Sequence, residues 1–305
     1  MRNPLSTAAL QAALRAEVPT QASVQPQLDA AIRRSASATG QLLRGRLVAA
    51  GALSQGATRA TARRLAVAVE YFHLASLLLD DLPCMDNAVY RRGRPCLHHE
   101  FGEATTLLSA LAFINRAYTL TAEALAAYPL PVRRAAWACL ESVLGPMGVV
   151  GGQARDLHYA AAKGGARAVG RIALEKTGAL FRLAIVLPAL LGRPSRRERR
   201  LLNALSTYVG LAYQAADDLQ DLVGEVAGTG KTTRRDEELG RPNLQLALGP
   251  EAAGARLARY RRLAADAYAG LVAEGRHWTY LEPVLRAGRP AVRNGRDVRR
   301  LNTAA

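Results

Sequence analysis

The segment YFHLASLLLDDLPCMD, residues 71–86, places a strongly apolar run directly before three aspartates. A second segment, LAYQAADDLQD at residues 211–221, has the same form: two adjacent aspartates and a third shortly after them. Pro83 interrupts the first segment, so we expect a helix to end near it and Asp86 to turn back towards that helix. The sequence therefore predicts two apolar helices that each end in a cluster of carboxylates.

Clustered carboxylates at the end of a buried helix repel one another and are costly to desolvate, so they persist where a cation offsets them. A few hard oxygen ligands suit Mg²⁺ that is held jointly with substrate phosphates. A solvated acidic helix end is the alternative, but six of the 11 aspartates lie in two clusters of similar form. The candidate metal ligands are Asp80, Asp81, Asp86, Asp217, Asp218 and Asp221.

Long stretches with helical apolar spacing surround these two segments, and the alternation typical of strands is nearly absent. We find no internal repeat and no linker, which predicts one all-α domain over residues 1–305. Within it we expect a loose N-terminal arm over residues 1–26 and a basic tail over residues 290–305. The expected helical stretches are 57–81, 103–127, 131–160, 165–191, 196–224 and 250–275.

The formal net charge is +16, and only three of the 41 basic residues are lysines. We interpret the arginines as a solvated surface rather than a nucleic-acid site, because aromatic residues make up only 5% of the chain. No apolar run is long enough to predict membrane insertion. Three cysteines without CxxC spacing favour a reducing, cytoplasmic location.

Basic residues accompany the aspartate clusters. YRRGRP, which begins at Tyr90, supplies Arg91 and Arg92, while EKTG and GTGKTT contain Lys176 and Lys231. GTGKTT lacks the spacing of a P-loop and follows a predicted helix, so we exclude that interpretation. A retained lysine in an arginine-rich chain indicates a need for a compact charge, as at a phosphate site.

Taken together, these segments resemble the trans-isoprenyl diphosphate synthases (polyprenyl synthetases), most closely the bacterial geranylgeranyl diphosphate synthases. The resemblance covers roughly residues 30–250. The segments that carry it, in the order of that family, are LLLDDLPCMDNAVYRRGRP, FGEATTLL, GGQARDL, EKTG, YQAADDLQD and GKTTRRDEELGRPN.

The resemblance implies a helical bundle around a central active-site cavity, commonly in a homodimer. It implies that three Mg²⁺ ions on the two aspartate clusters hold an allylic diphosphate and promote its ionisation. Isopentenyl diphosphate then attacks the allylic cation, which Thr177 shields. The implied catalytic residues are Asp80, Asp81, Asp217, Lys176 and Thr177. The implied substrate-binding residues are Arg44, His73, Arg91, Arg92, Lys176, Thr177, Gln214, Lys231 and Arg241.

The segment TGQLLRG departs from the glycine-rich, cationic stretch with which the family binds isopentenyl diphosphate. Gln41 and Leu42 stand where that family has two cations, whereas Arg44 matches. Arg46 is a possible compensating charge. His73 matches another contact of the family to this diphosphate, and Arg241, near the allylic diphosphate, replaces a family lysine.

This departure leaves two alternatives to a condensing synthase: a terpene synthase or cyclase on the same scaffold, and a non-catalytic synthase subunit. The two complete aspartate clusters argue against the second. Ala75 and Ser76, five and four residues before Asp80, predict an open pocket floor and a twenty-carbon product. Closure of the pocket by Phe113 or Leu111 is the alternative.

Overall fold

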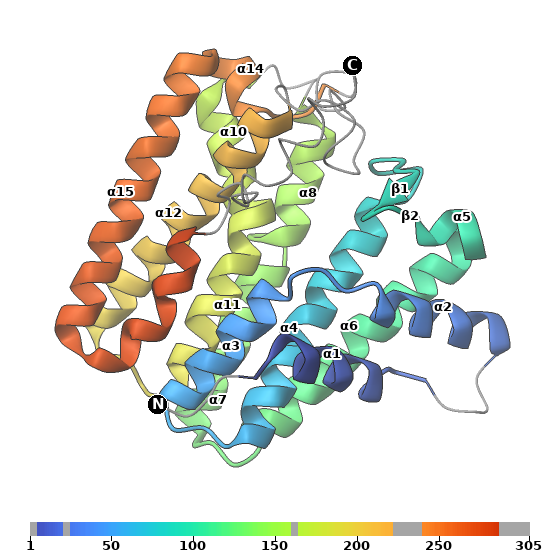
Figure 1. Ribbon diagram of the computed structural model, residues 1–305, viewed down its shortest axis with the longest axis horizontal. Coiled ribbons are helices and arrows are strands. Elements are labelled where there is room, and N and C mark those ends of the chain that lie inside the picture. The colour runs from blue at the N-terminus through green and yellow to red at the C-terminus, as the bar shows by residue number, and fades with distance from the viewer. Residues whose placement is uncertain (1–4, 21–24, 160–163, 222–239, 287–305) are drawn as a thin grey trace, which may run out of the picture.

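Figure 1 shows the computed structural model, which describes residues 5–20, 25–159, 164–221 and 240–286, without the side chains of Gln220 and Asp221. Within these ranges the chain forms a bundle of helices with one short hairpin, which confirms the expected all-α class. The first helices are α1 (Thr7–Ala16), α2 (Pro26–Ser37), α3 (Leu43–Ser54), α4 (Arg59–Asp80), α5 (Leu97–Phe101) and α6 (Glu103–Leu125). The later ones are α7 (Leu130–Leu144), α8 (Val149–Leu157), α10 (Ala166–Ala173), the π-helical turn η1 (Leu174–Gly178), α11 (Ala179–Leu190), α12 (Arg196–Asp221), α14 (Leu244–Leu248), α15 (Pro250–Glu274) and the 3₁₀ segment η2 (Arg276–Arg286).

Helix α4 is the centre of the first half and lies alongside α6 and α3 (Figure 1). The hydroxyl of Thr58 caps it by accepting a hydrogen bond from the backbone N–H of Thr61 at 3.1 Å. The helix ends at Asp80, as expected from the nearby Pro83, and the backbone N–H of Asp86 donates to the Asp80 carbonyl at 2.9 Å. The turn back at Asp86 is therefore confirmed.

Helices α11, α12 and α15 form the second half of the bundle. Helix α12 lies along α15 and also contacts η1, while nearly all of α11 is buried. Because α11 contacts both α4 and α12, it joins the two helices that carry the aspartate clusters.

Two stretches that were expected to be continuous helices are interrupted. The stretch 131–160 divides into α7 and α8 around Pro146, which lacks the N–H that a helix interior needs. The stretch 165–191 contains the π-helical turn η1 between α10 and α11. A π-helical turn inserts one residue into the helical register, and such turns occur often at functional sites.

The expectation of a loose N-terminal arm is wrong for α1. The Ser6 hydroxyl caps this helix by accepting from the backbone N–H of Ala9, and Leu10 and Leu14 are buried in the core. The Tyr71 hydroxyl donates to the Leu14 carbonyl at 2.6 Å. Burial of one apolar face thus holds α1 against α4, and the predicted basic tail lies outside the described residues.

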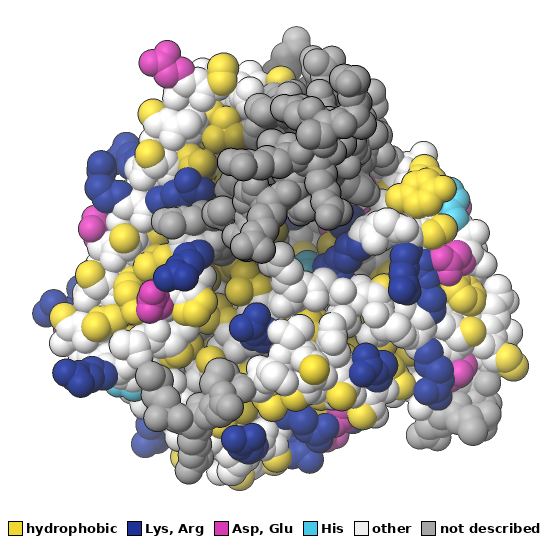
Figure 2. Space-filling model, in the orientation of Figure 1, with side chains coloured by type: hydrophobic (Ala, Val, Ile, Leu, Met, Phe, Trp, Pro, Cys, Tyr) yellow, Lys and Arg dark blue, Asp and Glu magenta, His cyan; other side chains and the backbone are white. Residues whose placement is uncertain are grey.

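A two-stranded hairpin follows the first aspartate cluster, with β1 (Tyr90–Arg91) paired antiparallel to β2 (Arg94–Pro95). Its two turn residues, Arg92 and Gly93, both have positive φ, as a tight hairpin requires. Figure 2 shows the basic side chains spread over the face in view rather than gathered in one patch. That distribution fits a solvated basic surface.

Candidate active site

The first aspartate cluster lies where α4 ends. Asp80 is half-buried, and burial raises the pKa of its carboxyl to about 6. The carboxylates of Asp86 and Asp156 act in the same direction, whereas the ammonium of Lys176 opposes them. The ionised form of Asp80 therefore depends on nearby positive charge.

Asp81 and Arg91, both predicted site residues, pair with each other. The Arg91 Nε donates to both carboxylate oxygens of Asp81 at 2.8 Å, and Asp81 is only 3% exposed. A bidentate pair of this kind fixes both side chains. It holds the hairpin against the end of α4.

Asp86, Arg241, Asp156 and Lys176 form one continuous network. Arg241 donates to the Asp86 carboxylate at 3.0 Å and lies 3.6 Å from the Asp156 carboxylate. Lys176 Nζ donates to Asp156 at 2.9 Å. Burial lowers the pKa of Lys176, but Asp80, Asp156 and Asp86 outweigh it, so the net pKa lies above the usual value. The structure thus places two predicted diphosphate-binding cations beside the first cluster.

Asp156 is the residue that the sequence reasoning missed. It is buried on α8 and contacts both Lys176 and Arg241. The motif GGQARDL, which contains it, was the available signal. A single aspartate without an acidic neighbour gave no reason to choose it.

The second cluster lies at the end of α12, where Asp217 is half-buried and Asp218 is 2% exposed. Asp218 accepts from the Gln214 amide at 2.8 Å and from the backbone N–H of Leu244 at 2.7 Å. It therefore ties α12 to the start of α14. The side chain of Asp221 and all of Lys231 lie outside the described residues.

Thr177 joins this cluster through Gln214. The Thr177 hydroxyl donates to the Gln214 side-chain oxygen at 2.7 Å, and Gln214 in turn donates to Asp218. Charged and polar groups in such a chain polarise one another. Lys176 and Thr177, adjacent on η1, thus contact Asp156 on α8 and Gln214 on α12.

The predicted acceptor residues Arg44, His73 and Arg92 also come together. Arg44 lies 3.4 Å from the His73 Nε2 and 4.7 Å above the Phe181 ring. Burial, and then the charges of Arg44, Arg92 and Arg91, lower the pKa of His73 well below its usual range. His73 is therefore neutral at pH 7, with cations around it.

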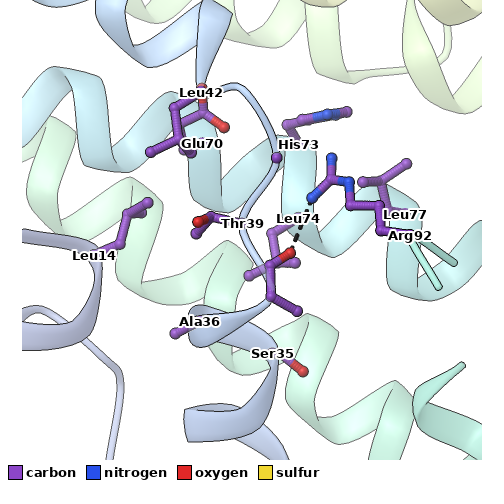
Figure 3. Close-up of a pocket in the computed structure, with 12 residues that line it drawn as sticks. Leu14, Ser35, Ala36, Thr39, Leu42, Glu70, His73, Leu74, Leu77 and Arg92 are labelled. Carbon is purple, nitrogen blue, oxygen red and sulfur yellow. Dashed lines mark hydrogen bonds between the residues drawn. The ribbon is translucent and has the colours of Figure 1, made fainter. Parts of the chain in front are cut away.

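A pocket adjoins these residues (Figure 3). Figure 3 shows His73 and the Arg92 guanidinium close together at one side, with Leu14 and Leu42 across from them. Arg92 donates to the Ala38 carbonyl at 2.9 Å. Buried nitrogens of Arg44 (Nε) and His73 (Nδ1) have no hydrogen-bond partner within the protein. Such donors fit a site that binds an anionic ligand.

The two residues that depart from the family pattern differ in their surroundings. Gln41 is exposed, whereas Leu42 is 5% exposed and has a φ of 52°. Arg46, the possible compensating cation, is exposed on α3. Arg44 is therefore the half-buried cation of this segment.

The carboxylates of both clusters fit Mg²⁺ to different degrees. Asp81 and Asp218 have both oxygens engaged by the protein, which leaves Asp80, Asp86 and Asp217 as better-suited ligands among the described side chains. No three acidic, His or Cys side chains within the described ranges are placed to hold a metal by themselves. Asp80, Asp86 and Asp217 offer carboxylate oxygens, the hard donors that Mg²⁺ prefers.

Comparison with known proteins identifies the family. The sequence profile described as polyprenyl synthetase matches residues 25–262. The chain is 35% identical to a geranylgeranyl diphosphate synthase of Pantoea ananas over 239 residues, 78% of this chain and 77% of that protein. It is 37% identical to the farnesyl diphosphate synthase of Escherichia coli K12 over 220 residues, 70% of this chain and 72% of that protein.

A solved structure agrees with the sequence comparisons. The fold is similar to that of an FPP/GFPP synthase from Zymomonas mobilis, with a TM-score of 0.76 and 31% identity over 91% of this chain and 93% of the other. Both aspartate clusters lie within the matched range 25–262. The profile match and the identity to these relatives together show that this chain belongs to the polyprenyl synthetase family.

Proposed function

We propose that this prenyltransferase joins isopentenyl diphosphate to an allylic diphosphate and releases geranylgeranyl diphosphate. The observation that carries the proposal is the convergence of Lys176 and Arg241 on Asp156, beside Asp80 and Asp86. The relatives named geranylgeranyl and farnesyl diphosphate synthases support the same substrate class.

The allylic half of the reaction belongs to the two clusters. Enzymes of this family are generally Mg²⁺-dependent, and we propose three ions per site. Bound Mg²⁺ supplies charge neutralisation to the leaving diphosphate. Lys176 and Arg241, together with Arg91, Gln214 and Lys231, bind the diphosphate oxygens, while the Thr177 hydroxyl shields the developing cation.

The acceptor half belongs to Arg44, His73 and Arg92. Their charges bind the diphosphate of isopentenyl diphosphate and orient its double bond towards the allylic carbon. Buried apolar walls on α4 and α11 exclude water that would quench the cation.

Starter preference tests the proposal. Purified protein with Mg²⁺ and isopentenyl diphosphate is supplied in turn with dimethylallyl, geranyl or farnesyl diphosphate, and the products are identified by mass spectrometry. We expect geranylgeranyl diphosphate as the final product and no turnover with excess EDTA. If the protein consumed none of the three starters, the result would contradict the proposed activity.

The floor of the product pocket is the basis for the twenty-carbon product. Ser76 and Phe72 lie one and two turns before Asp80 on the same face of α4. Phe72 contacts Tyr118 of α6 edge-on, with ring centroids 5.0 Å apart. Leu111 is 60% exposed and Phe113 packs against Tyr71, so Phe72 is a better-placed floor than either.

Phe72→Ala is expected to shift products to longer chains by one or more five-carbon units, because it removes the ring two turns below Asp80. Phe113→Ala removes a buried ring packed against Tyr71 and serves as the control, with product length unchanged. Mass spectrometry of the products from farnesyl diphosphate measures both. Unchanged product length in Phe72→Ala would show that another residue closes the pocket.

An apolar face on α6, α7 and α8 supports a homodimer. Tyr118 and Trp137 stack at 6.3 Å between α6 and α7, and both are partly exposed. By length and composition, residues Leu130–Leu157 could cross a membrane, but α7 ends at Leu144 and α8 begins at Val149. We assign the exposed apolar side chains to a subunit contact in a cytoplasmic enzyme: Leu107, Leu108, Leu111, Tyr118, Leu130, Trp137, Met147 and Val150.

Leu111→Asp is expected to convert the dimer to monomers, because a charge would be buried without a partner at the subunit contact. Leu246→Asp, an exposed apolar residue on α14, is the matched control and should leave the dimer intact. Analytical ultracentrifugation measures both. A wild-type monomer at micromolar concentration would contradict this assignment.

A further inference from the structure

The π-helical turn η1 carries Lys176 and Thr177, and two other helices approach its backbone unusually closely. A Cβ on Gly152 of α8 would lie 2.6 Å from the carbonyl carbon of Glu175 and from the nitrogen of Lys176. A Cβ on Gly210 of α12 would lie 2.5 Å from the Cα of Gly178. Both distances are shorter than any real side chain tolerates against backbone, so only glycine fits at either position.

The two approaching helices have the same internal arrangement. On α8, Gly152 is followed four residues later by Asp156, which accepts from Lys176. On α12, Gly210 is followed four residues later by Gln214, which accepts from Thr177. Residues four apart share one helix face, so each glycine and its polar partner both lie on the side of their helix that contacts η1.

We infer that Gly152 and Gly210 are positioning residues that set the place of Lys176 and Thr177 by clamping the π-helical turn from two sides. Each glycine brings its helix into backbone contact, and the polar residue one turn later then reaches the functional side chain. This inference rests on the proposed roles of Lys176 and Thr177. Backbone of α8 and of α12 lies against η1 at these two glycines, and these contacts fix where the side chains of η1 lie.

Gly152→Ala and Gly210→Ala test the clamp, with Gly170→Ala as the matched control. Gly170 lies on α10, the helix that directly precedes η1. A Cβ on Gly170 would meet nothing within 4 Å. We expect Gly210→Ala to lower kcat about 100-fold, because it displaces Thr177. We expect Gly152→Ala to raise the KM for farnesyl diphosphate about tenfold, because it displaces Lys176. The KM for isopentenyl diphosphate should stay within about twofold, because Arg44, His73 and Arg92 lie on other elements. Gly170→Ala should match the wild type.

A double variant separates positioning from loss of stability. If Gly210 acts through Thr177, then Gly210→Ala adds little to the defect of Thr177→Ala, whereas independent effects would multiply. Thermal unfolding of each variant identifies those that fail to fold, and the other glycine then carries the test.

The kinetics of the wild type distinguish a failure of the proposed function from a failure of the proposed clamp. An inactive wild type would contradict the proposed function, whereas an active one with both glycine variants equal to Gly170→Ala would overturn the clamp. Multiplying effects in the double variant, or unfolding of both glycine variants, would likewise overturn it, since the glycines would then serve only the fold.

Discussion

Asp80→Asn is expected to lower kcat/KM by about 1,000-fold or more. It removes a carboxylate proposed to hold the Mg²⁺ that neutralises the leaving diphosphate. Asp266→Asn, an exposed aspartate on α15, is the matched control and should retain full activity. Steady-state kinetics with farnesyl and isopentenyl diphosphate measure both variants. Wild-type activity in Asp80→Asn would contradict the metal assignment.

The same substitution is expected to stabilise the metal-free protein. Burial raises the Asp80 pKa from 3.8 to about 6, so the folded state prefers the neutral carboxyl. The contribution of Asp80 to stability is therefore full below pH 3.8 and is lost as the pH rises through about 6. At pH 7.5 without metal, Asp80→Asn should be more stable than the wild type by about 3 kcal/mol, with almost no difference near pH 3.

Added Mg²⁺ with inorganic pyrophosphate should reverse this order. Ligands that bind only the folded state raise its stability, and the variant would lack one of their contacts. Thermal unfolding at both pH values, with and without these ligands, measures the effect. Equal stabilisation of both proteins by the ligands would place the metal elsewhere.

Arg44→Gln is expected to raise the KM for isopentenyl diphosphate roughly 10- to 150-fold, because it removes a charge-assisted contact in the acceptor site. Arg44 is half-buried against His73 and Phe181, so its guanidinium is held in place before the substrate binds. The KM for farnesyl diphosphate should change little.

Arg46→Gln is the matched control for this prediction, since Arg46 is two residues away and exposed. We expect less than about a threefold change in either KM. A large effect of Arg46→Gln with none of Arg44→Gln would show that Arg46 compensates for the cations absent at Gln41 and Leu42.

The long helices could be predicted because their apolar spacing is regular. Helix α4 was expected over 57–81 and spans Arg59–Asp80, and α15 was expected over 250–275 and spans Pro250–Glu274. The π-helical turn could not be predicted, because residues 165–191 as a whole have the apolar spacing of one helix and no residue type marks the inserted position. Helix α1 was missed for a similar reason: its burial depends on α4, which lies far away in sequence.

The site could be predicted at the level of residue types but not of partners. The sequence presents Asp80 and Asp81 as equivalent neighbours, yet only Asp81 lies where Arg91 forms a bidentate pair with it. Asp217 and Asp218 differ likewise, because Asp218 accepts from the backbone of α14. Which member of each pair is engaged by donors of the protein depends on helix phase and tertiary contacts, and single-sequence patterns do not specify these.

The most direct test of the proposed condensation is an assay of purified protein with Mg²⁺. Farnesyl diphosphate is added either alone or together with isopentenyl diphosphate. Products are identified by mass spectrometry. We predict geranylgeranyl diphosphate only when both substrates are present, which would show that the acceptor site of Arg44, His73 and Arg92 works despite Gln41 and Leu42. A hydrocarbon or alcohol formed from farnesyl diphosphate alone, with no condensation product, would contradict the account and make the chain a terpene synthase on a prenyltransferase scaffold.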